Sequence, residues 1–181
     1  MEELNTMKMK LYDDTRDVMG AGIGCFYEAC TLLESKTEMN EDERTHFSDL
    51  KMRLIHDNDR YVNFLFGRTL VDPKKLKDVL EQKLETIEES YESLYGYLHP
   101  FEFEYTEGVP DQQVLKNNGY HFDSFEAFKE FQERVMGSAQ VMEISYRRIK
   151  DDIIPRLEHL RDYTSVMIED HIKSRMNEPE R

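Results

Sequence analysis

One segment of the chain carries apolar residues at alternating spacings of four and three: Leu80, Leu84, Ile87, Tyr91, Leu94 and Leu98. The residues between them are mostly polar or charged, and Lys83 and five glutamates are among them. Such spacing gathers the apolar side chains on one side of an α-helix and the charged ones on the other. Because the same pattern recurs along most of the sequence, it predicts an all-α fold.

The turn residues divide the chain into helices. We expect helices over residues 2–36, 41–66 and 73–99, and a fourth that begins after Asp123. The predicted fold is an antiparallel bundle of these four long helices plus a fifth C-terminal helix or kinked extension. A chain of 181 residues suits one domain, so we assign residues 1–181 to a single helical bundle.

The expected helix boundaries rest on capping residues. Asn40 followed by Glu43 resembles a capping box, in which each side chain bonds the backbone N–H of the other residue. Gly67 is expected to end the second helix. Asp72 then caps the third helix, and Pro73 occupies its first position, where a missing N–H costs nothing.

Pro155 leaves two alternatives open for the last part of the chain. The basic residues Arg147 and Arg148, followed by acidic Asp151, suit the end of one helix and the start of another. The apolar spacing instead continues past the proline, as a kinked helix would require. The sequence alone does not decide between a break and a kink.

Residues 99–123 form the one long connection. We expect the third helix to stop before Pro100, and the alternation of Phe101, Phe103 and Tyr105 with glutamates predicts a short extended piece. The aromatic content argues against disorder. The connection can cap one end of the bundle, return the chain along its side as a crossover, or cover a cavity as a lid.

Charge and cysteine content limit the classes of partner. The net charge is −14, from 24 basic and 38 acidic residues, which disfavours direct binding of nucleic acid. Cys25 and Cys30 are too few for a disulfide framework and fit a reducing compartment. There is no apolar leader and no apolar run of about 20 residues. We therefore expect a cytoplasmic protein that does not enter the membrane.

Three glycines interrupt the first helix at Gly20, Gly22 and Gly24. Each costs about 0.8–1 kcal/mol relative to alanine inside a helix, so a compensating role is expected. Gly20 and Gly24 share a face, and we expect another helix to approach closely there. A break in the helix and a ligand pocket are the other two interpretations.

Asp57 lies where the apolar pattern of the second helix calls for a hydrophobic residue. If the first two helices pair antiparallel through their short turn, Asp57 faces Gly20 and Tyr61 faces Arg16. An ion pair between Asp57 and Arg16, or a solvent-facing Asp57, is the structural interpretation. The functional one is a ligand pocket lined by Gly20, Gly24, Asp57, Tyr61 and Arg16.

The remaining motifs do not indicate catalysis. Glu43 and His46 are the only Glu-x-x-His pair, and the capping role already accounts for Glu43. No nucleophile motif surrounds a serine, and the cysteines lie on or beside an apolar stripe. We therefore predict no catalytic residues, no metal ligands and no cofactor.

These observations favour a non-enzymatic interaction or scaffold protein that forms a homo-oligomer and can also bind a protein partner. The alternative is a bundle that binds a small ligand or a metal between its first two helices. A third hypothesis makes the acidic chain a decoy for a basic, nucleic-acid-binding protein.

Overall fold

A computed structural model describes residues 2–55, 63–65, 67, 71–106, 122 and 125–160. The helices are α1 (Glu2–Lys36), α2 (Glu41–Ile55), α4 (Pro73–Thr106) and α6 (Phe125–Arg148). A π-helix, η1 (Ile149–Ile153), follows α6 directly, and residues 154–160 continue as helix. Within these ranges there is no β-strand. The predicted all-α class is confirmed.

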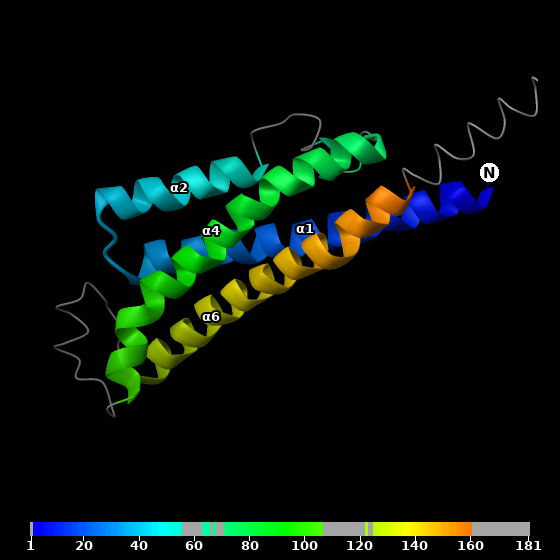
Figure 1. The fold of residues 1–181 in the computed structure, drawn as a ribbon. Helices are drawn as coiled ribbons and strands as arrows, with labels where there is room; N and C mark the ends of the chain where they lie inside the picture. The colour runs from blue at the N-terminus through cyan, green and yellow to red at the C-terminus, as the bar shows by residue number, and fades with distance from the viewer. Residues whose placement is uncertain are drawn as a thin grey trace, which may run out of the picture.

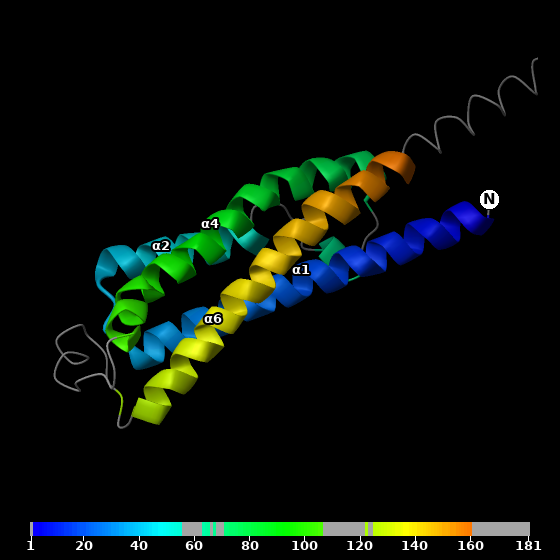
Figure 2. The same cartoon turned by 60° about the horizontal axis from the view of Figure 1, so that its bottom comes forward.

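Successive helices run in opposite directions, as Figures 1 and 2 show. α6 packs along both α1 and α4, while α2 packs mainly on α4. The end of α4 and the start of α6 lie at the same end of the molecule in both views, so no crossover along the bundle is needed to join them. Residues 107–121 of the predicted connection lie outside the described part of the chain.

The predicted caps at the starts of α2 and α4 are present, whereas α2 ends at Ile55 and residues 56–62, through which the second helix was expected to run, lie outside the described residues. The N–H of Glu43 donates to Asn40 Oδ1 at 2.8 Å, and the N–H of Asn40 lies 3.4 Å from Glu43 Oε1. The N–H of Lys75 donates to Asp72 Oδ1 at 3.0 Å at the start of α4. Gly67 has a φ of +73°, the left-handed conformation that suits glycine after a helical turn. The Asp123 cap lies outside the described residues.

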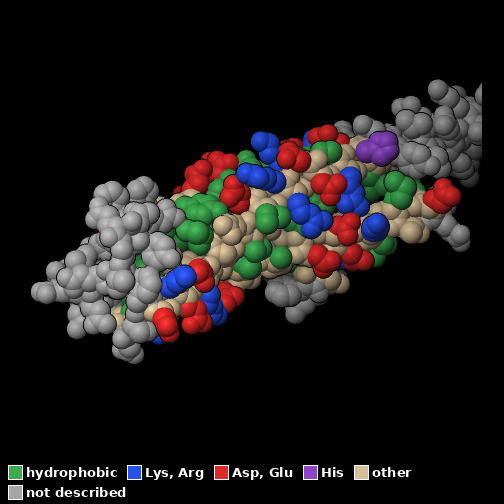
Figure 3. All heavy atoms as spheres, turned by 90° about the horizontal axis from the view of Figure 1, so that it is seen from below, with side chains coloured by type: hydrophobic (Ala, Val, Ile, Leu, Met, Phe, Trp, Pro, Cys, Tyr) green, Lys and Arg blue, Asp and Glu red, His purple; other side chains and the backbone are tan. Residues whose placement is uncertain are grey.

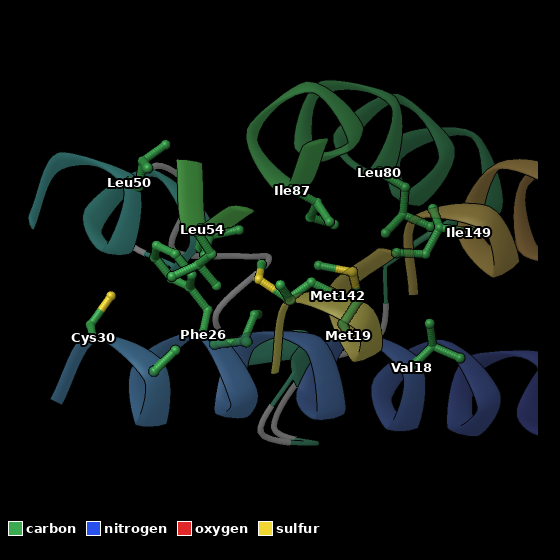
Figure 4. Packing of buried hydrophobic residues seen from close by; sticks show 14 of the residues in the cluster. Val18, Met19, Phe26, Cys30, Leu50, Leu54, Leu80, Ile87, Met142 and Ile149 are labelled. Atoms are coloured by element: carbon green, nitrogen blue, oxygen red, sulfur yellow. The ribbon is translucent and has the colours of Figure 1, made fainter. Parts of the chain in front are cut away.

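The core is formed by apolar side chains from every helix, and Figure 4 shows a part of it. Phe26 from α1, Leu54 from α2, Leu80 from α4 and Met142 from α6 are completely buried. One residue of the expected charged face is buried with them. Lys83 is only 4% exposed, and its Nζ donates to the carbonyl of Arg53 in the last turn of α2. A cation at a helix C-terminus is electrostatically favourable.

The prediction that the third helix stops before Pro100 is wrong, because α4 continues to Thr106. The short extended piece around Phe103 is therefore helical as well. A proline removes one backbone hydrogen bond from a helix, and the neighbouring turns can retain theirs. Alternation over only five residues was too short a pattern to outweigh the continuation of a long helix.

The structure also settles the question that Pro155 leaves open. The chain does not break there, and residues 154–160 remain helical. The π-helix lies just before the proline, where the N–H of Ile154 donates to the carbonyl of Ile149, five residues earlier. This wider turn gives the proline ring room next to the preceding carbonyls. Leu157 and Leu160 consequently stay in the core.

None of the described helices has an apolar stretch that is long enough to cross a bilayer.

Candidate functional site

The predicted pocket residue Arg16 has structural partners. Its Nε donates to the carbonyl of Phe64 at 2.7 Å, and its guanidinium lies 4.5 Å from the centre of the Phe64 ring. A further contact joins Arg16 to Asp13 at 3.1 Å. Arg16 therefore holds the helical turn at residues 63–65 against α1. Asp57 and Tyr61 lie outside the described residues, so the predicted pocket stays a prediction.

The contacts between α1 and α2 fix their register only to about one helical turn, and a slip of one turn would move Asp57 away from Gly20. The Tyr27 hydroxyl donates to the carbonyl of Lys51 at 3.3 Å, and the rings of Phe26 and Phe47 lie 6.2 Å apart. Both contacts, like that of Arg16, fall within about a turn of the register used to place Asp57.

The close helix approach occurs at Gly22, and the expectation for Gly20 and Gly24 is wrong. Those two glycines are exposed, and a Cβ on either would meet no atom within 4 Å. A Cβ on Gly22 would instead lie 3.0 Å from Ser145 Oγ on α6. Gly22 follows buried Val18 by one helical turn, so the apolar seam itself contained this signal.

Tyr12 is a buried polar residue that the sequence pattern did not single out. Its hydroxyl donates to the carbonyl of Val71, and its ring meets Phe64 edge-on at a centroid distance of 5.4 Å. It therefore fastens α1 to the start of α4. Burial, assisted by the negative charge of Asp72 and opposed by Arg16, raises the pKa of Tyr12 to about 12.

A second group of tyrosines joins α4 to α6. The ring of Tyr91 lies 6.2 Å from that of Tyr95 and 5.9 Å from that of Tyr146. The Tyr95 hydroxyl donates to Glu143 at 3.0 Å. Burial is the larger cause and this hydrogen bond the second cause that raise the pKa of Tyr95 to about 12. A hydrogen bond to Glu88, followed by burial, raises the pKa of Tyr146 to about 12.

Because the pKa values of these tyrosines are raised in the fold, we expect a loss of stability at alkaline pH. Between the ordinary tyrosine pKa of 10 and the folded value of about 12, the unfolded chain releases protons that Tyr12, Tyr95 and Tyr146 retain in the fold. Their contribution is therefore complete below pH 10 and is lost as the pH rises through that window. Urea unfolding at pH 8, 10 and 11 should show a decrease that is smaller in Tyr12→Phe. An identical decrease in that variant would contradict the role given to Tyr12.

The thiols lie in surroundings that disfavour the thiolate. Cys30 is buried, and burial raises its pKa to about 12. Burial, followed by the charge of Glu28, also raises the pKa of half-buried Cys25. Because the thiolate is the nucleophilic form, neither residue is activated for covalent catalysis.

A groove of about 340 Å³ lies between the N-terminal half of α1 and the segment that contains η1. Arg156 occupies one wall, with contacts to Asp14 at 3.0 Å and Asp152 at 3.3 Å. Lys10, Asp151 and His159 also line the groove. The apolar part of the groove consists of Met7, Leu11, Pro155 and Leu160. The groove thus combines an apolar surface with the ion pairs of Arg156, and sequence reasoning missed it because α1 and η1 are remote in the chain.

Among the described residues, the outward face of α6 is a second surface of interest. Ile144 is 57% exposed there, more than any other large hydrophobic residue among those described. A Cβ on Gly137, two turns earlier, would meet no atom within 4 Å. In Figure 3, which views the molecule from the α6 side, hydrophobic groups gather near the middle of the face and charged groups lie to either side.

The described residues contain no group of three or more histidine, cysteine or carboxylate side chains arranged to hold a metal ion. A comparison with known protein families, with curated proteins and with solved structures finds no match in any of the three. The function is therefore inferred from the residues of this chain.

Proposed function

We propose that the protein is a non-enzymatic helical interaction protein that associates with a second copy of itself. The observation that carries the proposal is the exposure of Ile144 on the outward face of α6. Burying an isoleucine side chain contributes roughly 1.5–3 kcal/mol, so a partner surface at this position would stabilise a complex.

Exposed methionines support the same function. Met7 is 49% exposed, and Met9 is similarly open to solvent. Methionine side chains adapt to irregular partner surfaces because they are flexible and unbranched. Met7 lies at the α1–η1 groove, so this groove offers a second contact surface for a protein partner.

The groove supports a protein contact better than a small-ligand site. Arg156, its most buried cation, already pairs with Asp14 and Asp152 and so is not free to orient a small molecule. The net charge of −14 also supports protein partners over nucleic acid. We assign the protein to the cytoplasm, where thiols such as Cys25 and Cys30 stay reduced.

Self-association predicts that the molar mass depends on concentration. Light scattering after size exclusion, at about 0.15 M salt, should give twice the chain mass of 21.7 kDa at high concentration and approach that mass on dilution. Ile144→Ser should shift the equilibrium toward the monomer. Met52→Ser, which removes an exposed apolar group from α2, serves as the matched control and should have little effect.

A wild-type mass of 21.7 kDa at every accessible concentration would overturn the proposed function. A dimer that Ile144→Ser leaves unchanged would contradict the role given to this residue.

A further inference from the structure

The outward face of α6 has an ordered charge pattern. Counted at spacings of three and four, it has three acidic residues, three uncharged ones and one basic residue, and a further acidic residue follows in η1. The face consists of Glu126, Glu130, Glu133, Gly137, Gln140, Ile144 and Arg148 on α6, followed by Asp151 in η1. Because Glu133 and Arg148 lie at equal distances from the middle of this face, each can meet the other in an antiparallel copy.

From this pattern we infer that two copies of the chain pair antiparallel through α6, about a two-fold axis that passes between Gln140 and Val141. The inference rests on the proposed self-association and names its surface. A two-fold contact uses the same patch on both copies, so each favourable pair occurs twice. Glu133 of each copy then faces Arg148 of the other.

The uncharged middle of the face fits the same register. The two-fold axis places Ile144 of one copy opposite Gly137 of the other. A Cβ on Gly137 would meet nothing within 4 Å, so packing among the described residues does not require a glycine there. It costs about 1 kcal/mol relative to alanine in a helix. In the pair, the missing side chain leaves room for Ile144 and lets the two helices approach closely.

The charges of this face are available for a partner. Neither Glu133 nor Arg148 forms an ion pair with any described residue, and both are exposed. Nearby Arg134 and Arg147 are instead engaged within the chain, by Glu28 and Glu143. The like-charged pair of Glu130 and Asp151 also occurs twice, one turn beyond each Glu133–Arg148 pair, and both side chains are exposed, so solvent and salt screen the repulsion.

A charge-exchange experiment tests this pairing. Glu133→Arg places arginine opposite Arg148, and Arg148→Glu places glutamate opposite Glu133, so each single variant should raise the dimer dissociation constant about tenfold or more. The double variant restores opposite charges and should recover most of the wild-type affinity. Glu85→Arg and Lys74→Glu, exposed positions on α4 with the same charge changes, are the controls. The dissociation constants come from sedimentation equilibrium, and circular dichroism checks that each variant is folded.

The outcomes separate this inference from the proposed function. Weak dimers for both single variants, with recovery in the double variant, would support the α6 pairing. If the wild type dimerises and the single variants match their α4 controls, the pairing is wrong while self-association stands. A monomeric wild type would overturn both.

Discussion

Replacing Gly22 with leucine is expected to lower the free energy of unfolding by about 3 kcal/mol. The new side chain would enter the contact between α1 and α6, where even a Cβ lies 3.0 Å from Ser145 Oγ. That hydroxyl also donates to the carbonyl of Val18 at 3.1 Å, so its displacement removes a hydrogen bond between the helices. Overpacking a core contact typically costs 1–3 kcal/mol and occasionally more. The higher helix propensity of leucine offsets about 0.8 kcal/mol of this cost.

Gly24→Leu is the matched control because it makes the same change two residues further along α1, on the opposite side of the helix. Gly24 is exposed, and a Cβ there would meet nothing within 4 Å. This variant should be neutral or more stable than the wild type by roughly 0.5–0.8 kcal/mol. Urea unfolding monitored by circular dichroism measures both variants. Equal stabilities would show that Gly22 is not the point of close approach.

Leu157→Ala is expected to destabilise the protein by about 2–5 kcal/mol. Leu157 lies beyond Pro155 and is completely buried. Its large expected effect follows from the π-helix, which lets the chain pass the proline and stay in contact with the core. A chain that broke at Pro155 would leave this residue outside the bundle.

His159→Ala is the control for this segment, because His159 is exposed two residues further along the same helix. An exposed substitution usually changes stability by less than about 0.5 kcal/mol. Thermal and urea unfolding of the two variants should therefore differ clearly. If Leu157→Ala were as mild as His159→Ala, the segment after Pro155 would not belong to the core.

The features that sequence predicts well are local. The cap at Asn40 and the cap at Asp72 each depend on a few neighbouring residues, and both are present. The apolar spacing of α4 likewise requires only helix geometry. Such features do not depend on the contacts between helices.

The features that sequence reasoning missed depend on which helices meet. The sequence pattern places Lys83 on a charged face. In the fold the end of α2 lies next to it, and its Nζ donates to the carbonyl of Arg53. Gly22 differed from Gly20 and Gly24 only through the position of Ser145 on α6. The position of a residue around its own helix limits which residues can be buried, and the contact with another helix determines which of them are.

Of the two candidate surfaces, one is local in sequence and the other depends on which helices meet. The charge order along α6, from Glu133 to Arg148, is readable from the sequence once the outward side of the helix is known. The groove next to Arg156 could not be predicted, because its walls come from opposite ends of the described chain. Neither surface contains the predicted pocket residues Gly20 and Gly24.

Site-directed cross-linking tests the α6 pairing most directly. Gln140→Cys places a thiol beside the proposed two-fold axis, so the two copies of this cysteine should lie within reach of a short bismaleimide. In the same antiparallel pair, two copies of Glu126→Cys would be about 40 Å apart along the helix axes. Denaturing mass spectrometry should therefore find a covalent dimer for Gln140→Cys and little for Glu126→Cys or the wild type. Equal yields from the two cysteine variants, or no dimer from Gln140→Cys, would contradict the pairing.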